Sequence, residues 1–155
     1  MRSRTVLLAE AKSEYSHWLL SCLAESHVTV LGSVSDPTIA LALGVEHAPD
    51  VALFGVEKMD CPMFAAGSAL LRRAPRTRVL FYAPQPDREL VGELLLAGAA
   101  GVACRTWTRG MVGRIVASLL RGDADADDAR SRVPRAPDLS GAVDPTLFLD
   151  SRSPV

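Results

Sequence analysis

The chain has 155 residues, of which 48% are hydrophobic and 23% are charged, and this suits one packed domain of about 120 residues followed by a tail. A net charge of −1 excludes a global attraction to nucleic acid, and the three cysteines show neither a CxxC pair nor metal-ligand spacing. Because no apolar run is long enough to span a membrane and the N-terminus lacks a signal-peptide pattern, we expect a cytoplasmic protein without a disulfide framework.

The first part of the chain alternates short apolar runs with stretches whose apolar residues recur at helical spacing. In chain order, the pattern predicts a strand at 5–9, a helix at 13–25, a strand at 28–32 and a helix at 37–47. Ser13 is the predicted N-cap of the first helix. Ser35 or Asp36 precedes Pro37, and a proline in the first turn favours a helix start.

The same alternation continues to about residue 121. It predicts a strand at 51–54 that ends at Gly55, a helix through 64–71, a strand at 78–82, a helix through 90–95, a weak strand at 99–104 and a last helix through 111–120. Asp87 and Thr108 are the predicted N-caps of the last two helices, and Gly98 is the predicted C-cap between them.

Strands that alternate with helices in this way predict an α/β domain with a doubly wound parallel sheet and helices on both faces. We assign residues 1–121 to this domain. Residues 122–155 are acidic and then rich in Pro, Ser and Arg, and this composition is typical of a disordered tail. One apolar patch lies at Leu147–Leu149, so docking of segment 146–150 on a surface stays an alternative.

In an open parallel sheet, ligands and chemistry lie at the carboxyl ends of the strands. The residues predicted at those ends are Glu10-Ala11, Gly55, Ala83-Pro84 and Arg105. One acid, one base and no nucleophile favour a binding or regulatory module over an enzyme. The sequence also lacks a GxGxxG loop after the first strand and a serine elbow, so we expect neither dinucleotide binding nor hydrolase chemistry. We expect no metal ion and no other cofactor.

Four segments carry a family resemblance: VLLAEAKSEY, HAPDVALFGVEKMD, RTRVLFYAP and LLLAGAAGVACRTWT. Together they resemble the receiver domain of bacterial two-component response regulators, in the branch usually fused to a LuxR-type helix-turn-helix. The resemblance covers residues 4–121 in order and spacing. It implies a flavodoxin-like (βα)5 fold with a five-stranded parallel sheet in the order 2-1-3-4-5.

The acidic residues of such receivers are largely missing. Receivers place two acids after the first strand, where this chain has Glu10 followed by Ala11. The aspartate that receives the phosphoryl group ends the third strand, where this chain has Gly55. Because glycine offers no nucleophile and Glu10 alone is a poor Mg²⁺ site, the resemblance implies a pseudo-receiver that aspartyl phosphorylation does not switch. Asp60 is the nearest alternative acid, and we interpret it as a solvated loop residue.

The switch residues of receivers differ as well. The Ser or Thr at the end of the fourth strand corresponds to Ala83, the Lys at the end of the fifth to Arg105, and the aromatic residue within the fifth to Val102. Glu10 and Arg105 would face each other, and a charge pair that locks one conformation is favoured over two separately solvated side chains. Trp107 lies beside the vacated pocket, as a partner or ligand contact or as simple packing; packing is favoured.

We therefore expect an atypical receiver that acts in signal transduction or transcriptional regulation through contacts with a protein partner or in a homodimer. The alternative is a small-molecule sensor that binds a metabolite in the vacated pocket. A third hypothesis, a DNA-binding regulator without its reader domain, is disfavoured because the tail holds no amphipathic helix pair. Neither nucleic acid nor a membrane is an expected partner of this chain.

Overall fold

In the computed structural model, the described residues are 4–24, 27–58, 60–84, 86–104 and 106–121. Their elements in chain order are β1 (Arg4–Ala9), α1 (Ser13–Leu23), β2 (Val28–Val34), α2 (Pro37–His47), β3 (Val51–Gly55), α3 (Pro62–Arg73), β4 (Arg78–Ala83), α4 (Arg88–Leu96), β5 (Gly101–Cys104) and α5 (Arg109–Leu119). The predicted tail 122–155, including segment 146–150, lies outside the described residues.

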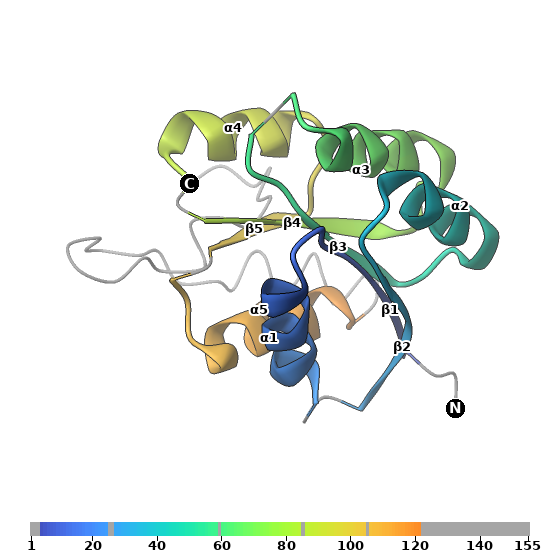
Figure 1. Ribbon diagram of the computed structural model, residues 1–155, viewed down its shortest axis with the longest axis vertical. Coiled ribbons are helices and arrows are strands. Elements are labelled where there is room, and N and C mark those ends of the chain that lie inside the picture. The colour runs from blue at the N-terminus through green and yellow to red at the C-terminus, as the bar shows by residue number, and fades with distance from the viewer. Residues whose placement is uncertain (1–3, 25–26, 59, 85, 105, 122–155) are drawn as a thin grey trace.

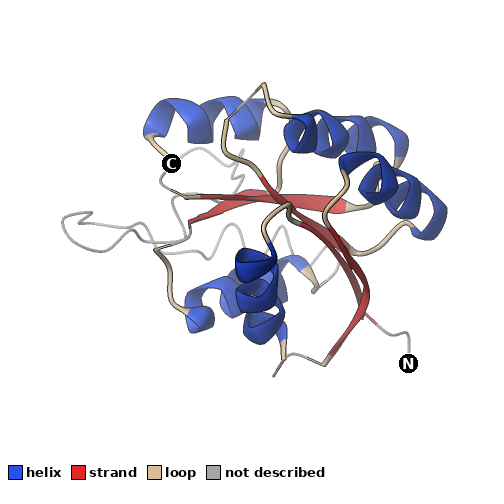
Figure 2. Ribbon diagram, in the orientation of Figure 1, coloured by secondary structure: helices blue, strands red, loops and turns tan. Residues whose placement is uncertain are grey.

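All five strands are parallel, and they form one sheet in the order β2-β1-β3-β4-β5. Helices α1 and α5 cover one face of this sheet, and α2, α3 and α4 cover the other (Figures 1 and 2). The predicted doubly wound α/β fold is therefore confirmed. Because the strands share one direction, their carboxyl ends meet at a single edge between the two helical layers, which is where such folds place their sites.

The core follows from strands that are apolar on both sides. All five residues of β3 are buried, as expected for a central strand covered by helices on both faces. Phe81 and Tyr82 are neighbours in β4 and point to opposite faces. Phe81 packs with Phe54 of β3 and Phe64 of α3, at ring-centroid distances of 6.4 and 5.5 Å. Tyr82 instead stacks on Trp18 of α1, at 5.9 Å.

Most predicted helix starts are confirmed by side-chain caps. Asp36 Oδ1 accepts a hydrogen bond from the Thr38 amide at 2.8 Å, Asp87 caps α4 and Thr108 caps α5. The prediction that Ser13 caps α1 is wrong, because Ser13 is already the first helical residue.

The starts of α1 and α3 both differ from what the sequence suggests. The N-cap of α1 is Lys12, whose side chain makes no capping bond. Helix α3 starts after Cys61, whose Sγ accepts from the Phe64 amide at 3.4 Å, a cap that the sequence analysis missed.

Two strand boundaries differ from the prediction. Strand β2 continues to Val34, whose carbonyl accepts the Glu10 amide at 3.0 Å and so extends the ladder to the end of β1. Strand β5 starts only at Gly101, because Gly98, with φ of 108°, turns the chain out of α4. Before the strand begins, the Ala100 amide donates a hydrogen bond to the Val79 carbonyl at 2.8 Å.

At the opposite, amino-terminal edge of the sheet, polar side chains hold the strands in register. The Asp50 Oδ2 atom accepts from the Thr5 amide at 2.9 Å, and the Asp50 amide donates to Thr5 Oγ1 at 3.1 Å. The buried Thr77 hydroxyl donates to the Pro49 carbonyl at 2.7 Å. These bonds tie β1, β3 and β4 together at the edge remote from the candidate site.

Candidate functional site

Three of the predicted site residues meet at the carboxyl edge of the sheet. Glu10 follows β1, Gly55 is the last residue of β3, and Ala83 is the last residue of β4. Strands β1 and β3 are paired up to Ala9 and Phe54, so Glu10 and Gly55 are brought together by the next step of that register. Glu10 is only 4% exposed although it is the one charged residue at these strand ends that the structure describes.

The Glu10 side chain lies directly against Gly55. A Cβ atom on residue 55 would stand 2.6 Å from Glu10 Cδ and 2.8 Å from Glu10 Oε2, closer than real Cβ contacts allow. The three heavy atoms nearest to that position all belong to the Glu10 carboxylate. The space that Gly55 leaves at the end of β3 is therefore occupied by a carboxylate that comes from β1.

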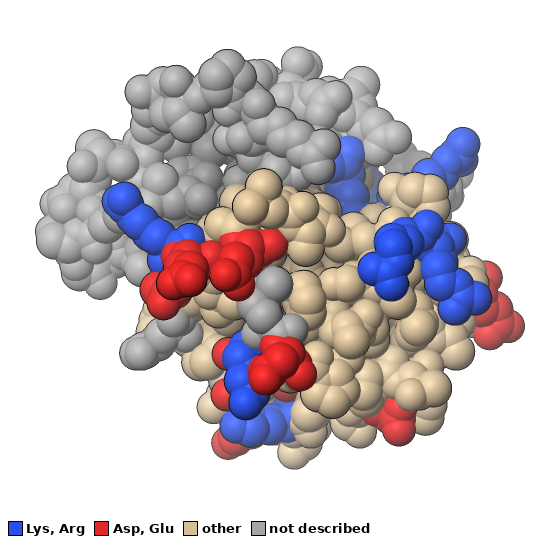
Figure 3. All heavy atoms as spheres, turned by 90° about the horizontal axis from the view of Figure 1, so that it is seen from above, with Lys and Arg blue, Asp and Glu red and all other residues tan. Residues whose placement is uncertain are grey.

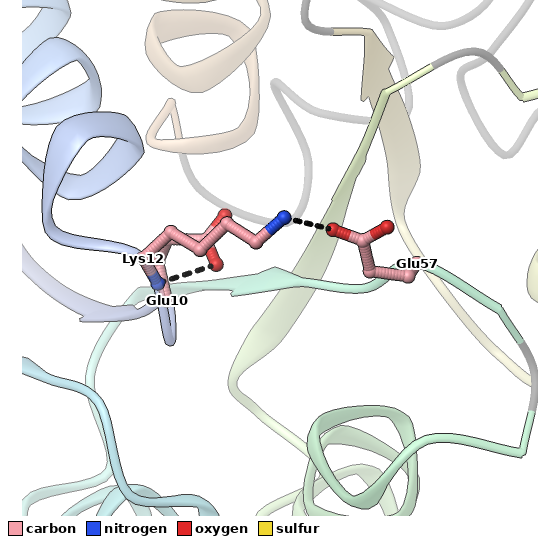
Figure 4. A network of polar contacts seen from close by, with 3 residues as sticks. All are labelled: Glu10, Lys12 and Glu57. Carbon is pink, nitrogen blue, oxygen red and sulfur yellow. Dashed lines mark hydrogen bonds and ion pairs between the residues drawn. The ribbon is translucent and has the colours of Figure 1, made fainter.

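Lys12 links this carboxylate to the next loop (Figure 4). The Lys12 amide donates to Glu10 Oε2 at 3.3 Å, and the Lys12 ammonium group pairs with Glu57 Oε1 at 3.2 Å. Both charged side chains are half-exposed, so water screens the pair and its contribution to stability is about 0–1 kcal/mol. Its main effect is to connect the loop after β1 to the loop after β3.

The same ammonium group reaches the aromatic side chains of α1. Lys12 Nζ lies 5.6 Å from the ring centroid of Tyr15, a cation–π distance. The Tyr15 ring meets Tyr82 edge-on at 6.5 Å, and Tyr82 stacks on Trp18. The Tyr82 carbonyl also accepts the Val56 amide at 2.8 Å. A continuous set of contacts thus joins the carboxyl edge of the sheet to the surface of α1.

Sequence reasoning missed Lys12, Glu57 and Tyr82. Lys12 stands two residues after Glu10 and Glu57 two residues after Gly55, so their opposite charges follow adjacent strand ends. That placement was a usable signal for the ion pair. Nothing in the sequence pointed to Tyr82, because an aromatic residue inside an apolar strand is expected to be core.

The remaining predicted residues divide by burial. Ala11 is exposed, whereas Ala83 and Val102 are fully buried and Trp107 is 3% exposed. The burial of Trp107 agrees with the packing interpretation, and in this conformation neither Trp107 nor Val102 presents surface to a partner. Arg105 lies outside the described residues, so its pairing with Glu10 stays a prediction.

Asp60 behaves as the sequence analysis expected. Its side chain is 78% exposed and lies 3.8 Å from the Lys58 ammonium group in the loop before α3. Three histidines, His17, His27 and His47, are also exposed. Among the described residues, no three His, Cys, Asp or Glu side chains come together in a group that could hold a metal ion.

Seen from the side of α2, α3 and α4, the described residues show a broad uncharged area, and acidic and basic side chains lie around it, in places directly side by side (Figure 3). Among the described residues visible on this face, the basic side chains do not form a continuous stripe. Within the described ranges, no helix is both long and apolar enough to cross a lipid bilayer.

No protein-family model and no curated protein sequence matches this chain. Solved structures do. The signal receiver domain of the response regulator NarL from Mycobacterium tuberculosis is 26% identical with a TM-score of 0.70, covering 79% of this chain and 100% of that one. This chain has the receiver-domain fold. A receiver domain of the Luxo repressor protein from Vibrio parahaemolyticus gives a TM-score of 0.71 at 13% identity, covering 84% and 98% of the two chains.

A third similar structure is CheY from Borrelia burgdorferi, solved in complex with CheX, BeF3 and Mg²⁺. It is 16% identical with a TM-score of 0.68, covering 75% of this chain and 88% of that chain. The receiver fold supports a signalling role of the response-regulator kind.

The residues at the carboxyl edge do not fit an Mg²⁺ ion. Magnesium takes octahedral oxygen ligands, usually with one or two carboxylates. Here Ala11 and Gly55 supply no side-chain oxygen, and one oxygen of Glu10 accepts the Lys12 amide.

Proposed function

We propose that this chain is an atypical receiver domain that aspartyl phosphorylation does not switch, and that it acts through protein–protein contacts. One observation carries the proposal: Gly55 ends β3, and the carboxylate of Glu10 fills the space where a side chain of residue 55 would project. The site is therefore blocked as well as lacking its nucleophile.

The chemistry of phosphoryl transfer supports this proposal. An acyl phosphate forms when a carboxylate oxygen attacks phosphorus, and glycine has no such oxygen. Glu10 is buried with an oxygen already accepting a backbone amide, so it is poorly placed for an in-line attack. Asp60 is exposed on a loop five residues beyond Gly55, with a lysine as its neighbour. We propose on the same grounds that the chain is not an enzyme.

Without phosphoryl transfer or another reaction, such a domain would act by contacting other proteins. The described surface carries two exposed large hydrophobic side chains, Ile39 on α2 at 52% and Leu96 on α4 at 91%. Single exposed apolar side chains are normal on protein surfaces, so these two residues are positions at which to look for a contact and do not by themselves mark one. Our proposal includes the LuxR-type branch, a role in transcriptional regulation, and a place in the cytoplasm.

The alternative, a sensor that binds a metabolite in a vacated pocket, is not favoured. It needs open space above Gly55 and Ala83, and Glu10 occupies the space above Gly55. A thermal-shift screen of metabolites separates the two functions, because a sensor would be stabilised by its ligand, with a shift that grows with the logarithm of ligand concentration above Kd.

Acetyl phosphate with Mg²⁺ tests the proposal directly. The full chain is incubated with the phosphodonor beside an ordinary receiver such as CheY, and intact masses are recorded. We expect the mass of one phosphoryl group to appear on CheY and none on this chain, with no change of elution volume in size-exclusion chromatography. A hydroxylamine-labile phosphoryl adduct on a carboxylate of this chain, together with a change of shape or assembly, would overturn the proposal.

A further inference from the structure

We infer that Glu10 is a built-in substitute for the missing carboxylate of β3, and that its occupation of the Gly55 space fixes the loops after β1 and β3 in one arrangement. The inference rests on the proposed function, because a fixed arrangement suits a receiver that phosphorylation does not switch. It makes Glu10 a positioning residue and assigns it no catalytic role.

The first step is mutual exclusion. The volume at the end of β3 accepts either the Glu10 carboxylate or a side chain on residue 55, because the two would stand within 2.8 Å of each other. The backbone of Gly55 is not in the left-handed region, so its conformation does not itself require glycine. The requirement for glycine at position 55 therefore comes from Glu10.

The second step is how Glu10 is held. Its amide donates to the Val34 carbonyl, which fixes the backbone at the junction of β1 and β2. Its Oε2 atom accepts the Lys12 amide. Helix α1 has no side-chain cap of its own at Lys12, so the Glu10 carboxylate supplies the acceptor and the negative charge that a helix N-terminus favours.

The third step is transmission to the rest of the edge. Lys12 contacts Glu57 on one side and the Tyr15 ring on the other, and Tyr82 and Trp18 continue the aromatic contacts. Displacement of the Glu10 carboxylate releases the Lys12 amide and disturbs both contacts. The state of one carboxylate is thereby coupled to the start of α1.

A double-mutant cycle between Glu10 and Gly55 tests the exclusion. In the wild-type background, Gly55→Ala places a methyl group against the carboxylate and raises the unfolding equilibrium constant. In the Glu10→Ala background the obstacle is gone, and the same substitution lowers that constant about two- to fivefold by restricting the unfolded chain. The sign of the Gly55→Ala effect reverses between backgrounds, with a coupling factor of about tenfold. Urea titrations of the four proteins measure it.

Two further variants of Glu10 separate the effect of its side-chain volume from that of its charge and provide a second background in case Glu10→Ala does not fold. Glu10→Gln keeps the volume, so Gly55→Ala stays unfavourable in that background. Glu10→Asp withdraws the carboxylate by one methylene and serves as the permissive background if Glu10→Ala does not fold. Gly92→Ala is the matched control, because no atom lies within 4 Å of its added Cβ and its effect should be equal in every background.

Spectroscopy tests the transmission. The Lys12 amide resonance in a nitrogen–proton correlation spectrum should shift in Glu10→Gln and Glu10→Ala, and the near-UV circular dichroism of the Tyr15, Tyr82 and Trp18 group should change with it. An equal effect of Gly55→Ala in all backgrounds, within about twofold, would overturn the exclusion. An unmoved Lys12 resonance would overturn the positioning role. Neither result depends on phosphoryl transfer, so failure of this inference and failure of the proposed function are read from different experiments.

Discussion

The packing of α3 on the sheet gives a quantitative test of the fold, through Gly67. A Cβ atom at this position would lie 2.7 Å from Phe81 Cε1 and 3.0 Å from Phe81 Cζ, against an ordinary carbon–carbon separation of about 3.5–4.0 Å. The Phe81 ring is fully buried and packs against Phe54 and Phe64, so these neighbours restrict its movement away from a new methyl group. Gly67→Ala therefore forces α3 and the aromatic cluster apart.

Two opposing contributions set the size of the effect. Overpacking of a well-packed core costs about 1–3 kcal/mol. Replacing an interior helical glycine by alanine returns about 1 kcal/mol of helix propensity. We expect a net loss of about 1 kcal/mol in the free energy of unfolding, which lowers Tm by about 4 °C in a domain of this size.

Gly92→Ala is the control, because it receives the same propensity gain inside α4 with open space around the new methyl group. It should stabilise the protein by about 0.5–1 kcal/mol. The difference between the two variants then isolates the overpacking cost. Urea titration with far-UV circular dichroism measures both free energies. If Gly67→Ala were as stable as Gly92→Ala, the close approach of α3 to the Phe81 ring would be refuted.

Three further predictions use other parts of the molecule. Gly44→Ala brings a Cβ to 2.7 Å from Leu70 Cδ1, the movable end of a side chain, so it should destabilise less than Gly67→Ala in the same titration. Thr77→Val leaves the Pro49 carbonyl without its buried hydroxyl donor and should cost about 1–3 kcal/mol in urea unfolding with an unchanged m value. Burial raises the pKa of the Cys22 thiol from 9.0 to about 11, so its contribution to stability is complete below pH 9.0 and should fall as the pH rises toward 11, where the unfolded chain ionises first. Cys22→Ala should remove that slope, and unchanged pH dependence in this variant would contradict the assignment.

The order and type of every element in the described domain were predictable because the signals were local. Apolar runs of strand length, and the carboxylates of Asp36 and Asp87 before helical periodicity, act within a few residues of themselves. Ser13 failed as a cap because α1 starts one residue earlier than that prediction requires, so that Lys12 takes the N-cap position.

The burial of aromatic side chains was predictable in kind but not in degree. Trp18 has helical spacing with other apolar residues, and the sequence analysis placed it in the core. It is only partly buried, packs against the core and stacks on Tyr82. Trp107 shows the reverse: it stands beside a capping threonine at the edge, yet it is buried.

The contact between Glu10 and Gly55 was predictable only in part. Sequence spacing placed Glu10 and Gly55 at one edge, since parallel strands end together, and the resemblance to receiver domains implied that Gly55 stands where those domains have their nucleophile. It did not determine where the Glu10 side chain points, because that depends on which empty volume lies within its reach in three dimensions. Glycine at the end of β3 creates that volume 45 residues further along the chain, and the carboxylate of Glu10, which follows β1, fills it. The glycine at position 55 and the placement of the Glu10 side chain look independent in the sequence, but they depend on each other in the structure. A side chain at position 55 would displace the Glu10 carboxylate, and the Lys12 amide at the start of α1 would then lose its acceptor.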